Sequence, residues 1–350
     1  MFLALQEIKH SKLRYGLVVG VIFLIAYLVF FLTGLAYGLA QESRMAVDKW
    51  DASGILLSDE ANDNINMSVI KNDDLTSVKA SKKASLSQSA GIIYKEDNDK
   101  ENVKFFGINS KDFLAPNITS GRMFKEANEV VVDDSLSDKG YKLGDIVKVT
   151  MSNEALKIVG FTNKAKFSIA PVVYMSRASL GRLKYDGNTK DADINAIVYR
   201  GDLKDKPSDL SNLPIKTFIN KLPGYSAQVS TFAFMIGFLV VIAAIVIGIF
   251  IYVLTMQKLD IFGVMKAQGI PTSYIAKSVL AQTFDLSFIG VILGLLGAYG
   301  TSLILPAAVP FEAKASYFIG ISILMILTAV LGALFSVKTV VKIDPLKAIS

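Results

Sequence analysis

Side chains able to catalyse a reaction or to hold a metal are scarce in this sequence. The absence of cysteine excludes thiolate metal sites and cysteine nucleophiles, and the sequence has a single histidine, His10. No serine–histidine motif, histidine–acid metal cluster or Gly-x4-Gly-Lys-Ser/Thr phosphate loop occurs. The adjacent acids Asp133 and Asp134 lie in a strand-like run, where neighbouring side chains point to opposite faces, so we expect a solvated strand end. We therefore expect no catalytic residue, no metal site and no cofactor.

Four long apolar stretches dominate the rest of the chain, which is 52% hydrophobic. They span residues 16–40, 229–256, 276–305 and 316–337. A helix needs about 20 apolar residues to cross a hydrocarbon core of about 30 Å, and only a helix satisfies its own backbone hydrogen bonds there. The pattern predicts four transmembrane helices, arranged 1+3 around a polar insert at residues 41–228.

Positive charge outside the insert predicts the orientation of these spans. It is concentrated in three groups: Lys9, Lys12 and Arg14; Lys258, Lys266 and Lys277; Lys338, Lys342 and Lys347. By the positive-inside bias, both termini and the loop after span two are cytoplasmic, so the insert faces outward. The formal net charge of +6 thus follows from membrane topology. We expect a bilayer as partner and no nucleic acid.

The outward insert predicts a mixed α/β domain with one modest core. Short β-rich runs with Gly, Asn and Asp at their boundaries recur at residues 102–108, 129–133, 145–151, 156–162, 171–174 and 193–200. Residues 135–139 and 176–184 have helical composition, and residues 41–66 predict a helix or stalk that continues span one. The fold class is therefore an α-helical membrane protein with an inserted extracytoplasmic α/β domain.

The cytoplasmic loop 257–271 predicts a short amphipathic helix that ends at Gly269 and Pro271. Such a helix lies in the membrane interface, docks in a groove of a partner protein, or simply connects two spans. In span three, Asp285 is the one acid within a span, and we favour a structural or coupling role over a proton relay. Gly290 and Gly294 indicate close helix packing.

At this loop the chain resembles the MacB/FtsX-type ABC transporter permeases. The segment Lys258-x-x-Ile-Phe-Gly-Val-Met-Lys-Ala-x-Gly269 is similar to their coupling loop, and Lys342-Ile-Asp-Pro-Leu-Lys-Ala-Ile349 is similar to their C-terminal motif. Phe262 and Asp260 depart from the Ile and Glu that are usual in the family. The resemblance implies that ATPase coupling involves Lys258, Asp260, Phe262, Gly263, Lys266, Gly269, Asp344 and Pro345.

The resemblance also implies the partners and the division of the chain. It implies a cytoplasmic ATPase subunit (HrtA-like) that binds ATP, a permease homodimer, and nucleotide-driven tilting of spans one and two that moves the outer domain. The expected parts are an N-terminal amphipathic helix 1–15, span one 16–40, outer domain 41–228, span two 229–256, coupling loop 257–275, span three 276–305, outer loop 306–315, span four 316–337 and cytoplasmic tail 338–350.

The opening residues and Leu32-Thr-Gly-Leu-x-x-Gly-Leu-Ala40 resemble the HrtB-type permeases, which implies hemin export across a Gram-positive plasma membrane. Haem needs an axial ligand, and no histidine lies outside, so Tyr, Met or a carboxylate must serve. The candidates are Tyr27, Tyr37, Glu42 and Met45, although tyrosine is also ordinary at a membrane boundary. Two alternatives remain: an exporter or sensor permease for antimicrobial peptides or lipids, and an FtsX-like activator of a cell-wall hydrolase.

Overall fold

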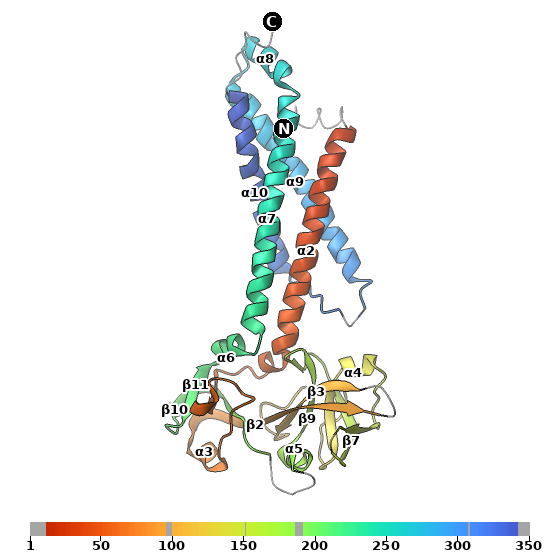
Figure 1. Ribbon diagram of the computed structural model, residues 1–350, viewed down its shortest axis with the longest axis vertical. Coiled ribbons are helices and arrows are strands. Elements are labelled where there is room, and N and C mark those ends of the chain that lie inside the picture. The colour runs from red at the N-terminus through yellow and green to blue at the C-terminus, as the bar shows by residue number, and fades with distance from the viewer. Residues whose placement is uncertain (1–11, 96–99, 151, 186–191, 307–308, 342–350) are drawn as a thin grey trace. The chain divides into compact units, whose positions relative to one another are not determined.

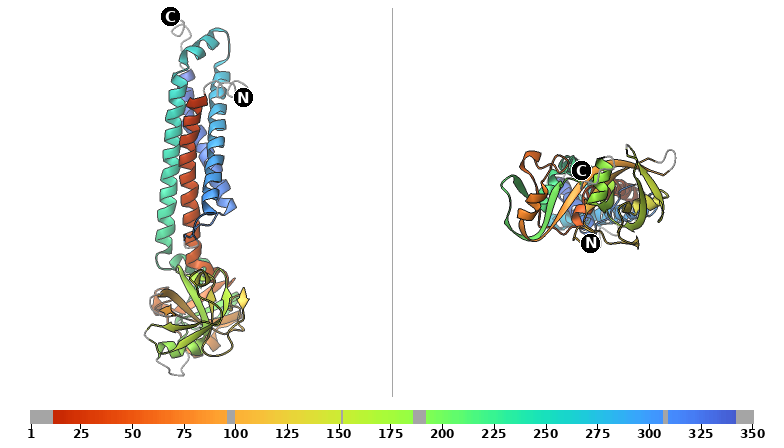
Figure 2. Two further views of the ribbon diagram at one scale, coloured as in Figure 1. Left: turned by 90° about the vertical axis from the view of Figure 1, so that its right-hand side faces the viewer. Right: turned by 90° about the horizontal axis from the view of Figure 1, so that it is seen from below.

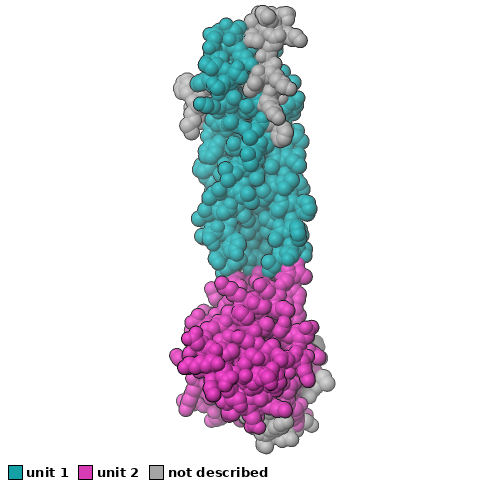
Figure 3. Space-filling model, turned by 90° about the vertical axis from the view of Figure 1, so that its left-hand side faces the viewer, with its two compact units in different colours: residues 1–38, 229–350 teal, residues 39–228 magenta. Residues whose placement is uncertain are grey.

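The computed structural model describes residues 12–95, 100–150, 152–185, 192–306 and 309–341. The chain divides into two units, which Figure 3 colours separately: Met1–Gly38 with Val229–Ser350, and Leu39–Gln228. Within these described ranges, four helices are long and apolar enough to cross a membrane. They are α2 (Lys12–Asp48), α7 (Tyr225–Met256), α9 (Thr272–Ser302) and α10 (Ala315–Val341). The predicted set of four helices, one before the insert and three after it, is confirmed.

Figures 1 and 2 show the long helices of the helical unit running alongside one another. The unit is held together by apolar packing and by the close approach of small residues. A Cβ at Gly290 would lie 2.5 Å from the Ile22 side chain, and one at Gly294 would lie 2.6 Å from the Ala26 Cβ. Because neither glycine has a side chain, α9 and α2 pack with almost no space between them. The packing role predicted for these two glycines is therefore confirmed.

The unit 39–228 is built on a mixed β-sheet. Its strands are β1 (Gly54–Ser58), β2 (Lys79–Tyr94), β3 (Glu101–Ile108), β4 (Ser120–Gly121), β5 (Glu129–Asp133), β6 (Ile146–Val149), β7 (Ala155–Thr162), β8 (Lys166–Phe167), β9 (Ala170–Ser176), β10 (Ala196–Asp205) and β11 (Leu210–Pro214). The order is β11-β1-β10-β2-β3-β9-β5-β7-β4, and β6 pairs with both β2 and β7. Strands β2, β3, β9, β5, β7 and β6 thus close a ring, which removes the exposed edges of an open sheet.

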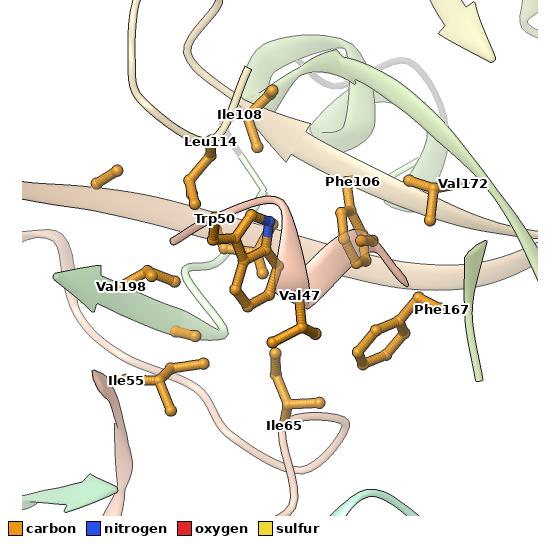
Figure 4. Packing of buried hydrophobic residues seen from close by; sticks show 14 of the residues in the cluster. Val47, Trp50, Ile55, Ile65, Phe106, Ile108, Leu114, Phe167, Val172 and Val198 are labelled. Carbon is orange, nitrogen blue, oxygen red and sulfur yellow. The ribbon is translucent and has the colours of Figure 1, made fainter. Parts of the chain in front are cut away.

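Short helices complete this unit: η1 (Asp59–Ala61), α3 (Asn72–Ser77), α4 (Ser135–Asp138), α5 (Arg177–Lys184) and α6 (Ile215–Lys221). Its apolar side chains form three clusters rather than the one modest core that we expected. The largest cluster surrounds Trp50, whose ring centroid lies 6.1 Å from that of Phe106 (Figure 4). Val47, in the last turn of α2, is buried in the same cluster, so this helix end is part of the core of the domain.

The helix predicted to continue out of span one is confirmed as far as Asp48, but β1 begins at Gly54, so it does not extend over all of residues 41–66. A second expectation for this unit is wrong. Asp133 is 1% exposed and is not a solvated strand end. Its carboxylate accepts hydrogen bonds from the Ser135 hydroxyl and from the amides of Ser135 and Ala165. Asp134 is exposed, as expected.

Candidate functional site

The loop between α7 and α9 contains the predicted short helix, α8 (Leu259–Ala267), followed by Gly269 with φ +87°. This left-handed conformation is favourable for glycine, and Gly269 follows the end of the helix and lies two residues before Pro271. Figure 1 shows α8 as a short separate helix at the end of the helical unit, between α7 and α9. Asp344 and Pro345, and residues 1–11 of the N-terminal amphipathic helix, lie outside the described residues.

One face of α8 packs into its own unit. Phe262 is 3% exposed and belongs to the same apolar cluster as Tyr15 and Ile275, and Gly263 is also buried. At the start of the helix, the Lys258 ammonium donates a hydrogen bond to the Tyr15 hydroxyl at 2.5 Å and lies 5.3 Å from the centre of its ring. These contacts attach α8 to the first span and to the start of α9.

The opposite face of α8 is open. Ile261 is 57% exposed and Val264 is 44% exposed, and Asp260, Ala267 and Gln268 are exposed beside them. Ile261, Val264 and Gln268 follow the spacing i, i+3, i+7, which aligns side chains along one helix face. Of the residues predicted to couple, Phe262 and Gly263 therefore lie inside the unit, whereas Asp260 and Gly269 are accessible and Lys258 and Lys266 are half-buried. Ile261 and Val264 lie on the open face but were not among the residues predicted to couple.

A second candidate region lies on the other half of α2. Six aromatic side chains form a continuous series of ring contacts, which we call the aromatic cluster: Phe23, Tyr27, Phe30, Phe31, Phe311 and Phe318. Tyr27 stacks on Phe31 at 5.9 Å between ring centroids with 11° between their planes, and Phe31 contacts Phe311 at 5.7 Å. The rings of Phe30 and Phe318 are 5.4 Å apart. Three of these residues, Phe23, Tyr27 and Phe31, repeat every four residues and so share one face of α2.

Two glycines of α2 let the segment after α9 approach this cluster. A Cβ at Gly34 would lie 2.3 Å from the Phe311 ring, and a Cβ at Gly38 would lie 2.0 Å from the Pro310 carbonyl oxygen. The amide of Glu312 donates a 3.1 Å hydrogen bond to the Gly34 carbonyl. Residues 309–312 therefore pack against the Leu32–Ala40 segment of α2.

A cation, Lys314, lies next to this packing contact between residues 309–312 and α2. The Lys314 ammonium is 5.2 Å from the centre of the Tyr37 ring and 5.4 Å from that of Tyr317, and the two rings are 5.2 Å apart. Such an arrangement is a cation–π interaction, worth about 0.5–1 kcal/mol at an exposed site. Lys314 and Tyr317 are exposed, so the charge stays accessible to an anionic group.

The four predicted haem ligands all lie on α2 but do not form one site. The Tyr27 hydroxyl is 3.0 Å from the Thr301 hydroxyl, and Glu42 forms an ion pair with Lys166. Met45 is half-buried. Because a helix rises about 1.5 Å per residue, Tyr27 and Glu42 are about 22 Å apart along the axis, so one iron cannot contact both. Tyr27 and Tyr37 belong to the helical unit, and Glu42 and Met45 belong to the other unit.

The polar groups within α9 have an unusual environment. Asp285 Oδ2 and Gln282 Nε2 are buried and have no hydrogen-bond partner among the described residues. They are three residues apart, so they share a helix face. A buried polar atom without a partner costs free energy, which makes this pair a place where a further polar group would stabilise the helix. The structural or coupling role expected for Asp285 stays a prediction.

Acidic and histidine side chains do not cluster in a way that would hold a metal ion anywhere in the described ranges. One ion pair of the β-sheet unit has a structural position. Glu129, 4% exposed, accepts bonds from the Arg122 guanidinium and from the amides of Lys125 and Glu126. The guanidinium and the two amides lower the pKa of Glu129 to about 2.

Comparison with known proteins gives full-length relatives. A Staphylococcus epidermidis protein with the provisional name hemin transport system permease protein HrtB is 29% identical over 355 residues, covering 100% of this chain and 99% of that protein. Its Staphylococcus haemolyticus counterpart is 27% identical over 352 residues with the same coverage. An uncharacterised ABC transporter permease of Mycobacterium tuberculosis is 25% identical over 354 residues, 99% of both chains.

Solved structures and family models match as well. The crystal structure of the periplasmic region of MacB from Actinobacillus actinomycetemcomitans aligns with a TM-score of 0.34 and 15% identity, covering 48% of this chain and 92% of that one. The model of the MacB-like periplasmic core domain matches residues 15–205, and that of the FtsX-like permease C-terminal domain matches residues 233–345. Since the first alone covers more than half of the sequence and the second continues it, the chain belongs to the MacB/FtsX family of ABC transporter permeases.

Proposed function

We propose that this multi-pass membrane protein is the permease subunit of an exporter whose ATP-hydrolysing subunit is a separate, HrtA-like chain. The observation that carries the proposal is the open face of α8, where Ile261 and Val264 are exposed beside Asp260. An exposed apolar stripe on a short helix suits a groove on a partner protein. The sequence has no phosphate-binding loop, so ATP must be bound by that partner.

The contacts of α8 support its role as the coupling element. Phe262 packs in the helical core, and Lys258 is bonded to Tyr15 near the start of α2. A displacement of α8 by the ATPase would therefore act directly on the first span. In this proposal α8 and both termini are cytoplasmic, and residues 41–228 lie outside a Gram-positive plasma membrane, as the positive-inside bias indicates.

We propose hemin as the substrate. The full-length likeness to proteins provisionally named for hemin transport supports this choice, and so does the chemistry of the aromatic cluster. Haem is flat and aromatic and carries two carboxylates. The stacked rings of Tyr27 and Phe31 present π-faces of the same kind, and the accessible ammonium of Lys314 is a counter-ion for a carboxylate. Tyr27 or Tyr37 is the axial ligand in this proposal.

Transport in this proposal is mechanical and involves a homodimer of the permease. α2 has 37 residues and α7 has 32, and both run without a break from the helical unit into residues of the β-sheet unit. Closure of two ATPases would tilt these helices and move the outer domain. No hydrophilic tunnel is needed, because the substrate is taken from the membrane.

A deletion strain tests the proposal. We expect loss of the gene to lower hemin tolerance and leave bacitracin sensitivity unchanged, with rescue by the wild-type chain. The double variant Ile261→Asp with Val264→Asp should not rescue, because two carboxylates would block an apolar groove. The matched control is Met67→Asp with Val69→Asp, two residues that are 69% and 61% exposed in the other unit; this pair should rescue. Raised peptide sensitivity with normal hemin tolerance would instead favour a peptide exporter, and septation defects would favour a hydrolase activator.

A further inference from the structure

The unit 39–228 contains a small polar cavity that the transport proposal does not use. Its volume is about 310 Å³, and its lining includes two cations, Lys49 and Arg200, with the phenol of Tyr174. Residues 113–117 form the rest of the wall. Lys49 follows the last residue of α2, and Arg200 lies on β10, so three separate segments bring these donors together.

Arg200 is a half-buried guanidinium without an acidic partner. Its Nε donates a 2.7 Å hydrogen bond to the Trp50 carbonyl, and its central carbon lies 4.6 Å from the centre of the Phe113 ring. No ion pair involves Arg200 in the part of the chain that the structure describes. The two terminal nitrogens therefore stay available, and they form the planar fork that matches an oxyanion.

Lys49 is the second cation of the cavity lining. Its ammonium donates to the Thr162 hydroxyl at 3.0 Å and to the Asn163 carbonyl. Burial lowers the pKa of Lys49, whereas the nearby Asp133 and Asp134 favour its charged form and Lys164 opposes them. Asp133 is itself saturated by Ser135 and Ala165. The charges of the two acids and of Lys49 and Lys164 balance, so Arg200 leaves a net charge of about one, which suits a singly charged ligand.

Tyr174 supplies the observation that points to a ligand. It is 1% exposed, its ring meets that of Phe106 edge-on at 5.8 Å, and its hydroxyl has no hydrogen-bond partner among the described residues. Buried hydroxyl groups in folded proteins are nearly always hydrogen-bonded. Burial raises the pKa of Tyr174, so the phenol keeps its proton and is a donor at neutral pH.

We propose that this cavity binds a phosphate group carrying one negative charge, held by Arg200 and Lys49 and hydrogen-bonded by the Tyr174 hydroxyl. Three donors on three segments surround a tetrahedral oxyanion better than they surround a planar carboxylate. The same chemistry is offered by dihydrogen phosphate and by the phosphodiester of a phospholipid head group. Binding would fasten the end of α2, at Lys49, to β9 and β10.

The test uses the full chain in detergent and two probes. Sodium phosphate is titrated at pH 6, where it is mostly singly charged, against sodium chloride of equal ionic strength, with heat of binding as the readout. Native mass spectrometry counts the phosphatidylglycerol molecules retained, with phosphatidylcholine for comparison. Arg200→Gln should weaken binding at least ten-fold, and Tyr174→Phe, which keeps the ring, about three- to ten-fold. The control Arg182→Gln removes an arginine of α5 outside the cavity and should bind as the wild type does.

Heat from phosphate alone assigns the cavity to the free anion, and selective retention of phosphatidylglycerol alone assigns it to a lipid. Either result supports the proposal when Arg200→Gln and Tyr174→Phe reduce it. The proposal is overturned if neither probe binds, or if both variants bind like the wild type. Because Tyr174→Phe preserves the apolar packing, a loss of binding in that variant with an unchanged melting temperature cannot come from misfolding.

Discussion

Replacing Gly38 by alanine tests the close packing of residues 309–312 against α2. The new Cβ would lie 2.0 Å from the Pro310 carbonyl oxygen and 2.6 Å from its carbonyl carbon. These are backbone atoms, which cannot rotate away as a side chain can. The amide of Glu312 is also bonded to the Gly34 carbonyl, so the segment must shift as a whole. Overpacking of this kind costs about 1–3 kcal/mol.

Gly20 on the same helix is the matched control, since a Cβ there meets nothing within 4 Å. Each glycine-to-alanine change gains a similar helix propensity, about 1 kcal/mol, so this gain cancels when the two variants are compared. The difference that remains is the overpacking cost. At about 2–4 °C per kcal/mol, Gly38→Ala should melt about 2–12 °C below Gly20→Ala.

The assay is thermal unfolding of the purified full chain in detergent, followed by hemin tolerance of complemented cells. We expect Gly38→Ala to lower both, because a shifted segment moves Lys314 away from Tyr37. If Gly38→Ala melts together with Gly20→Ala or above it, residues 309–312 do not rest on α2, and the geometry of the aromatic cluster is wrong.

Three further predictions concern other parts of the chain. Glu129→Gln should destabilise its unit by about 1.5–3 kcal/mol in urea unfolding followed by the emission of Trp50, the only tryptophan. Since the pKa of Glu129 falls from about 4.5 to about 2 on folding, its contribution is complete above pH 4.5 and disappears as the pH falls through 2; equal pH profiles for both proteins would contradict this. Phe262→Ala should lower the melting temperature, as a buried Phe-to-Ala change costs about 3–5 kcal/mol, whereas Ile261→Ala should leave it unchanged and weaken ATPase binding in a pull-down. Tyr27→Phe should abolish the hemin-induced shift of the Soret band if Tyr27 is the axial ligand, and Thr301→Val, which removes the hydroxyl that contacts Tyr27 and donates to the Gly297 carbonyl, should retain the shift.

Local patterns were sufficient to predict the four long helices, α4, α5, α8 and several strands, but not η1, α3 and α6. The helix α8 was predicted from its apolar spacing and from Gly269, and the strand Glu129–Asp133 has the predicted bounds. The long strand β2 was missed, because Lys79–Tyr94 is rich in lysine and serine and contains a glycine. It forms because residues 79–86 pair with β10 and residues 87–93 pair with β3, and such long-range pairing leaves no local signal.

The accessible face of α8 could not be predicted for a related reason. Phe262 lies one residue after Ile261, and α8 has apolar side chains on both of its faces, so periodicity does not say which face is buried. The orientation of α8 depends on tertiary contacts such as the hydrogen bond from Lys258 to Tyr15, which is 243 residues away along the chain. The same holds for Tyr27, whose hydroxyl partner Thr301 is 274 residues distant. The family resemblance predicts the coupling segment, but only tertiary contacts separate its buried residues from those that are free to contact the proposed partner.

That separation changes how substitutions in the segment must be interpreted. A change at Phe262 or Gly263 alters the attachment of α8 to the first span, so a loss of transport in such a variant reports on the permease itself. A change at Ile261 or Val264 alters only the open face, so in the proposed function the same loss reports on the contact with the ATPase. The two classes differ in melting temperature, because only the first removes buried apolar contacts. Measuring the melting temperature together with transport therefore distinguishes a lost attachment of α8 to the first span from a lost contact with the proposed partner.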